Sequence, residues 1–357
     1  MINAPKTCGK IYMCGRIRGC IWKMFRIKAI SGVHNNYYHS TVNIMSQRKY
    51  ISEFGLNMVN GYRFLLQQEQ LIEVDKTGIE PHIYIVTRRP RITLDPSSVK
   101  FTNEIVTGTF KKQIKDELIS IPFVTKNNLS CSNPSLKCEY PYTDYEIVDD
   151  NNEIISNGKC ALLLASISSK YWEHLDLEVL YVGQSYGKDG KRTASERLKS
   201  HSTLQGIYAE AIKNSPDQDI WLILSTFEPL LLTTFDGSSK NHVKTMEEDS
   251  VHIDNVIRTQ ITEQQQINFT EAALIRYFQP TYNIIYKDSF PNPAHSTYSE
   301  CYDIDLNMVS VEIQSEDLGL RLWSGSVEPK WAHFCTFPLH SKEDRKYMFE
   351  FDGVNYL

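Results

Sequence analysis

The segments LYVGQS, at residues 180–185, and TEAALIRYFQPTYN, at residues 270–283, enclose the part of the chain that decides the fold. The segment RLKSH, at residues 197–201, lies between them. Together they supply a tyrosine close to a glycine, an arginine and a histidine one helical turn apart, a single glutamate and a final asparagine. These residue types suit phosphodiester cleavage, which needs a positioned water, a cation for the phosphate oxygens and an acidic ligand for a metal ion.

Four apolar runs in this region have the length and composition of strands. They cover residues 160–167, 177–185, 219–229 and 281–287. The polar residues between the first two runs fit a hairpin. We therefore expect an α+β fold class, in which a small central antiparallel sheet is flanked by helices.

Two capping patterns predict the helices near the middle of the region. Thr193 and Glu196 match a capping box that opens a helix just before Arg197. Arg197 and His201 are then four positions apart and share one helix face. A second box begins directly after His201, which predicts that this histidine lies at a joint between two helices. The second helix is expected over residues 203–214.

The last helix of the region is expected to carry the glutamate. Asn268 and Glu271 fit the N-cap and third position of a helix, and Gln279 with Pro280 ends it. Residues 230–267, which precede this helix, are mostly polar. They are predicted to form an insertion, such as a lid or a docking loop.

The motifs of this region resemble those of the GIY-YIG nuclease superfamily. Tyr181 and Gly183 match the second strand motif of the family, and Arg197 with His201 resembles its helical arginine and following histidine. Glu271 resembles the metal-binding glutamate. Pro280 and Asn283 match its P-x-Y-N tail, best in the nucleotide-excision-repair endonuclease branch. The resemblance covers residues 158–290 and implies a metal-dependent endonuclease.

One motif of the family departs from its pattern in this sequence. The family carries a tyrosine on its first strand, where residues 160–167 read CALLLASI and place Leu163 or Leu164 at that position. Tyr171 could supply the phenol if the hairpin is drawn differently. If neither does, either Tyr181 works alone or the region is a catalytically inactive module that binds nucleic acid or serves in assembly.

The resemblance implies roles for the site residues. Arg197 would neutralise charge at phosphorus, and Glu271 would bind one Mg²⁺ or Mn²⁺ ion. Tyr181 would hold or deprotonate the attacking water, and His201 would move that proton. Gly183 would let the backbone approach the substrate, and Asn283 would tie the end of the region to the helix. DNA is favoured over RNA as the substrate.

The flanking segments carry weaker signals. Residues 1–50 hold nine Lys or Arg and no Asp or Glu, so they form a basic arm. Three interpretations of the arm stay open: a disordered segment that contacts phosphates, an amphipathic surface segment, or a mis-assigned start with translation beginning at Met45. Residues 51–157 predict an α+β domain with a short helix over 110–121. Residues 291–357 predict a C-terminal β extension, and either flanking region could bind a protein partner.

Charge, apolar runs and cysteine content limit the possible partners and location of the protein. The net charge of −5 argues against tight DNA binding without help, because phosphate contacts need clustered Lys and Arg. No apolar run approaches the ~20 residues of a membrane helix, so no membrane role is expected. The eight cysteines contain no C-x-x-C pair, which favours free thiols in a reducing compartment. We therefore expect a cytoplasmic protein.

Overall fold

The computed structural model describes residues 12–14, 47–186, 193–237, 242–295 and 299–351. Most of the predicted basic arm, including Met45, lies outside these residues. None of the helices in the described part of the chain combines the length and the apolar character needed to cross a membrane.

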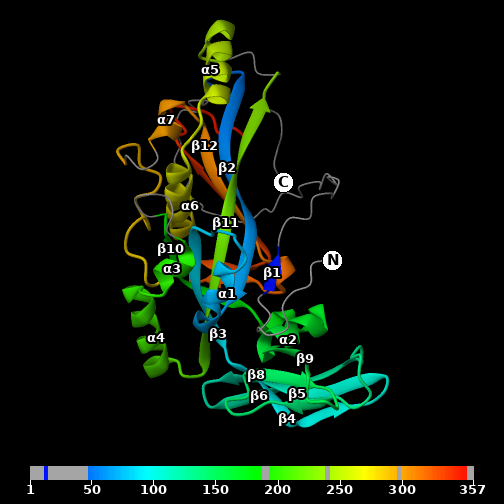
Figure 1. Ribbon diagram of the computed structural model, residues 1–357. Helices are drawn as coiled ribbons and strands as arrows, with labels where there is room; N and C mark the ends of the chain where they lie inside the picture. Colours follow the sequence, from blue (N-terminus) through cyan, green and yellow to red (C-terminus); the bar gives the residue numbers. More distant parts are fainter. Residues whose placement is uncertain (1–11, 15–46, 187–192, 238–241, 296–298, 352–357) are drawn as a thin grey trace, which may run out of the picture.

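A large mixed sheet forms the body of the molecule (Figure 1). Its strand order is β14-β13-β10-β3-β11-β2-β12-β15, and β1 also pairs with β2. The strands are β1 Tyr12–Cys14, β2 Ser52–Leu66, β3 Ile83–Pro90, β10 Leu177–Gln184, β11 Gln218–Phe235, β12 Met308–Gln314, β13 Leu322–Ser324, β14 Val327–Lys330 and β15 Ala332–Pro338. Two pairs, β10 with β13 and β2 with β12, are parallel.

The predicted fold class is therefore wrong. Strand accounts for 40% of the structure and helix for 26%, and the sheet is neither small nor purely antiparallel. The central sheet was predicted from strands between residues 160 and 290 alone, and the strands expected before and after them were assigned to separate regions. The sheet also recruits β2 and β3 from earlier in the chain and β12 to β15 from later, because all of these strands bury apolar side chains against the same core.

Two three-stranded sheets interrupt the chain between β3 and β10. They are built from β4 Ile92–Phe101, β5 Ile105–Ile114 and β6 Glu117–Lys126, and from β7 Ser135–Lys137, β8 Asp144–Val148 and β9 Ile154–Lys159. Figure 1 shows both at one end of the molecule. The helix expected over residues 110–121 is instead the β5–β6 hairpin. The four-residue spacing of Phe110, Ile114 and Leu118 predicted one apolar helix face, but Ile114 and Leu118 are exposed.

The helices pack against the large sheet and against the two smaller ones. They are α1 Leu71–Asp75, α2 Cys160–Ile167, α3 Ala194–Leu198, α4 Ser202–Asn214, α5 Met246–Arg258, α6 Glu263–Phe278 and α7 Glu300–Asp303, with the short 3₁₀ turns η1 Gln68–Gln70, η2 Ser169–His174 and η4 Glu316–Leu318. Residues 160–167 were expected as a strand. They form α2 because alanine and leucine favour helix, and the nearly unbroken apolar run has no alternation that would mark a strand.

Strand β3 separates two hydrophobic cores. Ile83 and Ile85 belong to the larger core, which also holds the apolar side of α6. Tyr84 and Val86 belong to a smaller core that contains residues of α1, α3 and α4. Successive side chains of a strand point to opposite faces, so Tyr84 is directed towards the two short helices that follow β10.

Candidate active site

Strands β3 and β10 bring two tyrosines together. In the antiparallel register Tyr84 of β3 lies opposite Gly183 of β10, and Tyr181 is two residues before this glycine. The rings of Tyr84 and Tyr181 are stacked, with their centroids 6.1 Å apart. Tyr84 is fully buried, whereas Tyr181 keeps some exposed surface. The residues of β3 and β10 therefore place two phenols side by side at one end of the strand pair.

Gly183 makes this approach possible. A Cβ atom at position 183 would lie 2.5 Å from both Cζ and Oη of Tyr84 and 2.8 Å from Cε1 of Tyr181. Contacts this short require the buried rings or the strand backbone to move. The expected role of Gly183 was backbone approach to the substrate, and the structure shows that its missing side chain makes room for the two tyrosines.

We expect Gly183→Ala to misplace Tyr84 and to lower the free energy of unfolding by about 1–3 kcal/mol, as overpacking a buried site does. Gly206→Ala is the matched control, because a Cβ atom there meets nothing within 4 Å and alanine favours the α4 helix. Urea unfolding of both variants measures the difference. Equal stability of the two variants would contradict the tight packing at Gly183.

Arg197 and His201 both contact the hydroxyl of Tyr84. The Nε atom of Arg197 donates to Oη of Tyr84 at 3.1 Å, and Nε2 of His201 lies 3.1 Å from the same oxygen. The ring of His201 also lies 5.5 Å from the ring of Tyr181. Arg197 and His201 were predicted to share one site with Tyr181, and Tyr84 is the residue that joins them.

The joint between α3 and α4 holds these two side chains. The predicted capping box is present, with Thr193 as N-cap of α3 and Glu196 reaching back to it. His201 is itself the N-cap of α4, where its Nδ1 atom accepts the backbone N–H of Leu204 at 3.1 Å. The prediction of a helix joint at His201 is thus confirmed.

Hydrogen bonds to α1 also hold α3 in place. Asp75, at the end of α1, accepts hydrogen bonds from Ser195 and, at 2.8 Å, from Nζ of Lys199. These two residues flank Arg197 on both sides. The bonds hold the pKa of Asp75 below its usual range although burial opposes this. The orientation of Arg197 therefore depends on α1 as well as on α3.

Glu271 reaches the same region from α6. This helix begins after its N-cap Thr262, so Asn268 is not the N-cap and Glu271 lies in the middle of the helix. Burial raises the pKa of Glu271 to about 7, while the charge of Arg197 and the backbone N–H of Gln184 act in the opposite direction. The negative charge of a carboxyl group with this pKa is poorly stabilised by the protein, and a nearby cation would stabilise it.

Burial also raises the pKa of both phenols. For Tyr84 the charge of Tyr181 adds to this, while Arg197 lowers its pKa. For Tyr181 the charge of Glu271 adds to burial, and the hydrogen bond with Tyr84 and the charge of Arg197 oppose it. Both tyrosines are therefore neutral near pH 7 in the structure as it stands.

Asn283 joins the end of the region to β10. Its Oδ1 accepts the backbone N–H of Val182, and its Nδ2 donates to the carbonyl of Val182, both at 2.9 Å. The strand expected over residues 281–287 is not formed, and these residues are turn and coil. The side chain of Asn283, rather than a strand ladder, therefore links this segment to the backbone of β10.

Tyr171 lies outside this arrangement. It is buried in η2, where its hydroxyl donates to the carbonyl of Pro122 in β6 at 3.1 Å. Leu163 and Leu164 are in α2 and likewise do not reach the two tyrosines. Tyr84 is the residue that the sequence analysis missed. Its signal is HIY at residues 82–84, which lies within residues 51–157, the segment predicted to form a separate α+β domain.

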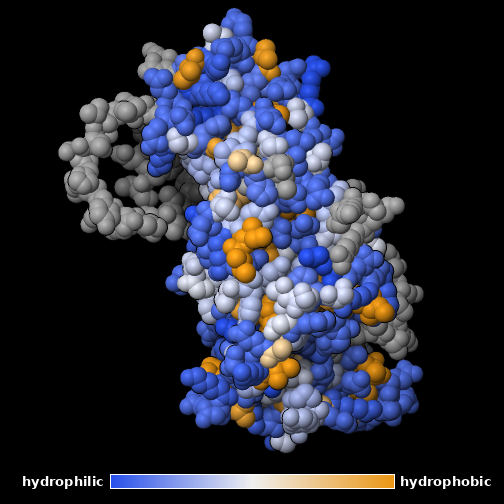
Figure 2. Space-filling model, turned by 90° about the vertical axis from the view of Figure 1, so that its left-hand side faces the viewer, coloured by the Kyte–Doolittle hydropathy of each residue, from blue (hydrophilic) through white to orange (hydrophobic). Residues whose placement is uncertain are grey.

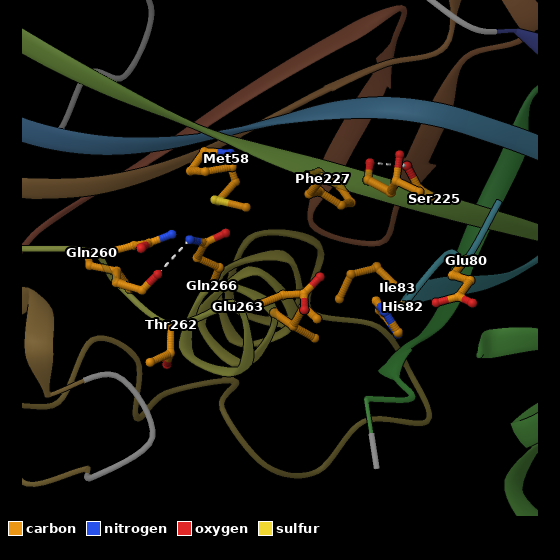
Figure 3. Close-up of a pocket in the computed structure, with 14 residues that line it drawn as sticks. Met58, Glu80, His82, Ile83, Ser225, Phe227, Gln260, Thr262, Glu263 and Gln266 are labelled. Carbon is orange, nitrogen blue, oxygen red and sulfur yellow. Dashed lines mark hydrogen bonds between the residues drawn. The ribbon is translucent and has the colours of Figure 1, made fainter. Parts of the chain in front are cut away.

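We call Tyr84, Tyr181, Arg197, His201 and Glu271 the candidate site. None of these five residues lines the cavity of about 470 Å³ whose lining Figure 3 shows. The lining comes from β2, β3, β11 and the start of α6, and includes His82, Glu263 and Gln266. The lining contains the carboxylates of Glu80 and Glu263, which make this cavity unsuited to a phosphate group. Arg197, in the candidate site, is the cation that suits a phosphate.

The donor set of the candidate site fits one divalent ion held by one protein ligand. The described residues contain no group of three His, Cys, Asp or Glu that could enclose a metal ion. Glu271 alone offers an anionic oxygen, and its raised pKa is the observation that supports such a role. Mg²⁺ keeps several waters and binds through one or two carboxylates together with phosphate oxygens, so a single glutamate suits it.

Comparisons with protein-family models, with curated proteins and with solved structures found no match for this chain. The residues of the candidate site and their contacts therefore carry the functional argument.

Proposed function

We propose that the protein is a metal-dependent endonuclease that hydrolyses phosphodiester bonds in nucleic acid, with DNA as the favoured substrate. The observation that carries this proposal is the direct contact of Arg197 and His201 with Tyr84, beside Tyr181. Residues far apart in the sequence meet there in the set that phosphodiester cleavage needs. The same residues resemble the motifs of GIY-YIG nucleases.

Tyr84 completes the resemblance. HIY at residues 82–84 differs in one residue from the letters GIY, and YVG at 181–183 differs in one from YIG. Both tyrosines lie on paired strands. The inactive module was an alternative because the first-strand tyrosine was not found, and Tyr84 removes that reason. We therefore keep the nuclease and do not propose the inactive module.

The hydrogen bonds around Tyr84 define the direction in which its proton points. Nδ1 of His201 accepts the N–H of Leu204, so the neutral ring carries its proton on Nε2. That proton and the Nε–H of Arg197 are then both donated to Oη of Tyr84. The hydroxyl proton of Tyr84 is left for Tyr181, and this bond favours the phenolate of Tyr181.

We therefore propose that Tyr181, in its phenolate form, is the general base that takes a proton from the attacking water. A bound divalent cation supplies positive charge that lowers the pKa of a nearby phenol or water and polarises the phosphate. Glu271 would hold this ion. Tyr84 orients Tyr181 and stabilises its negative charge. The water oxygen bonds to phosphorus as the bond to the leaving oxygen breaks, and the leaving oxygen takes a proton from solvent.

Arg197 is proposed to bind the phosphate itself. Among the described residues its side chain makes one hydrogen bond, from Nε to Tyr84, so both terminal nitrogens can reach phosphate oxygens. A guanidinium group can hold two such oxygens at once as negative charge develops on them. Tyr84 thereby also fixes the position of Arg197 before the substrate arrives.

His201 receives a different role from the one that the resemblance implied. Moving a proton in the neutral pH range would require the ring to be protonated at both nitrogens, which would break the bond to Leu204 that caps α4. We propose instead that His201 is a positioning residue for Tyr84. Its replacement would then lower the cleavage rate at all pH values without changing the shape of the pH profile.

The proposal is tested by incubating the wild-type protein with duplex DNA, single-stranded DNA and RNA, with Mg²⁺, with Mn²⁺ and with a chelator. We expect cleavage of at least one substrate that requires the metal ion. Glu263→Gln, in the same helix as Glu271 but outside the candidate site, should cleave as the wild type does. Absence of metal-dependent cleavage on all three substrates would overturn the proposal.

A further inference from the structure

A short loop next to the candidate site exposes two isoleucines. Ile284 is 91% exposed and Ile285 is 67% exposed, directly after Asn283. Figure 2 shows that apolar side chains on the visible face form small separate groups on a largely hydrophilic surface. Single exposed apolar residues are common, but an adjacent pair of isoleucines this exposed is not explained by packing.

The backbone of this loop is held at both ends. On one side the N–H of Tyr282 donates to the carbonyl of Leu180 at 3.0 Å, and Asn283 makes its two bonds to Val182. On the other side Arg276 and Gln279, from the end of α6, both donate to the carbonyl of Lys287. Arg276 also pairs with Asp288 at 3.0 Å. The two isoleucines are thus presented on a braced turn.

The bracing also keeps the backbone of the two isoleucines close to β10. Asn283 is bonded to the residue between Tyr181 and Gly183. Consecutive Cα atoms are 3.8 Å apart, so the backbone of Ile284 and Ile285 is within roughly 4–8 Å of that of Asn283. Successive nucleotides of one DNA strand are ~3.4 Å apart along the axis. A phosphate at the candidate site would therefore place the neighbouring base steps near these side chains.

We propose that Ile284 and Ile285 form an apolar wedge that enters the base stack of duplex DNA beside the phosphate to be cleaved. The inference rests on the proposed nuclease function and extends it by assigning a distorted duplex as the substrate. Apolar side chains inserted between base steps unstack and kink a duplex. A turn whose backbone is held by hydrogen bonds at both ends suits this role because less of it must be ordered on binding.

A protein partner fits this feature less well. Stable protein interfaces bury about 1,200–2,000 Å² in total and have an apolar core of many side chains. Two isoleucines on a turn are too small for such a core. The space between two unstacked bases, in contrast, accepts one or two aliphatic side chains.

The test compares cleavage of matched substrates by the double variant Ile284→Ser/Ile285→Ser. We expect its single-turnover rate on duplex DNA to fall about tenfold or more, because unstacking a base step costs enough to change a rate by that factor. Its rate on a duplex with a bulge at the cleavage position, where the bases are already unstacked, should stay within about twofold of the wild-type rate. Ile284→Leu/Ile285→Leu should keep the duplex rate.

Two controls separate the possible failures. Ile212→Ser/Ile257→Ser changes isoleucines that are 75% and 67% exposed in α4 and α5, and should leave all rates unchanged. Equal loss on the intact and bulged duplexes, or no loss on either, would overturn the wedge alone. A change of oligomeric state in the serine variant would assign the pair to contact between copies, which also overturns it. Absence of cleavage by the wild type would overturn the nuclease function itself.

Discussion

Glu271→Gln is expected to abolish metal-dependent cleavage and, at the same time, to stabilise the protein above pH 7. Glutamine keeps the size of the side chain but removes the anionic oxygen proposed to hold the metal ion. We expect the single-turnover rate to fall by about 10³-fold or more, a loss of ~4 kcal/mol in transition-state stabilisation. Glu263→Gln controls for the loss of a carboxylate from the same helix.

The stabilising effect follows from the pKa of Glu271. Burial raises this pKa from 4.5 to about 7, so the folded state binds the proton more tightly than the unfolded state. Stability is then lost as the pH rises from 4.5 through 7, and the charged carboxylate costs on the order of 3 kcal/mol above pH 7. Glutamine does not ionise, so the variant avoids this cost.

Thermal unfolding at pH 5 and pH 8.5 measures this difference. The Tm of Glu271→Gln should be close to that of the wild type at pH 5 and higher at pH 8.5. Addition of Mg²⁺ at pH 8.5 should raise the Tm of the wild type and leave that of the variant unchanged, since a ligand of the folded state stabilises it. A variant that responds to Mg²⁺ as the wild type does would show that Glu271 is not the metal ligand.

Arg197→Ala should lower the single-turnover rate by about 10²-fold or more while changing DNA affinity only slightly. Its guanidinium is proposed to meet negative charge that develops at phosphorus, so its contribution is larger in the transition state than in the ground state. Arg197→Lys should recover only part of the rate, because an ammonium group cannot hold two oxygens in a fixed geometry.

The matched control for Arg197 is Lys199→Ala, which removes a cation from the same short segment. Lys199 is exposed and pairs with Asp75. Its loss should have a small effect on the rate through the orientation of α3. Equal rates for Arg197→Ala and Lys199→Ala, measured in folded proteins, would show that Arg197 acts only by its general charge.

Local patterns in the sequence predicted the parts of the site that depend on short-range interactions. The capping box at Thr193 and Glu196 is formed, and His201 lies at the helix joint. The end of α6 at Gln279 is also as expected, with this residue in the left-handed conformation that closes a helix. Such features depend on hydrogen bonds between residues only a few positions apart, so a short window of sequence contains them.

The partner of Tyr181 could not be found in the same way. Strand β3 lies next to β10 in the sheet, but residues 91–176 separate them in the chain and form two small sheets and α2. The apolar run nearest to β10 in the sequence therefore led to residues 160–167 as the first strand and, as an alternative, to Tyr171 as the partner of Tyr181. Pairing between distant strands is decided by burial in a shared core, which the sequence of either strand alone does not reveal.

The prediction that a strand ends at Pro229 was wrong for a related reason. Strand β11 continues through Pro229 to Phe235. Strand β3 pairs with β11 only up to Ser225, so beyond that point one side of β11 has no β3 neighbour. Proline is tolerated in a strand where its missing N–H would face no partner. The sequence could not show this, because it depends on where another strand ends.

The central claim is that Tyr84, and not Tyr171, completes a site for phosphodiester cleavage with Tyr181, Arg197, His201 and Glu271. The most direct measurement is the single-turnover cleavage rate of Tyr84→Phe beside that of Tyr171→Phe, with folding checked by thermal unfolding. Tyr84→Phe removes the buried hydroxyl that contacts Arg197 and His201, whereas Tyr171→Phe removes a buried hydroxyl that donates to the carbonyl of Pro122. We predict a fall of about 10²-fold or more for Tyr84→Phe and a wild-type rate for Tyr171→Phe. Wild-type cleavage by folded Tyr84→Phe would contradict the account.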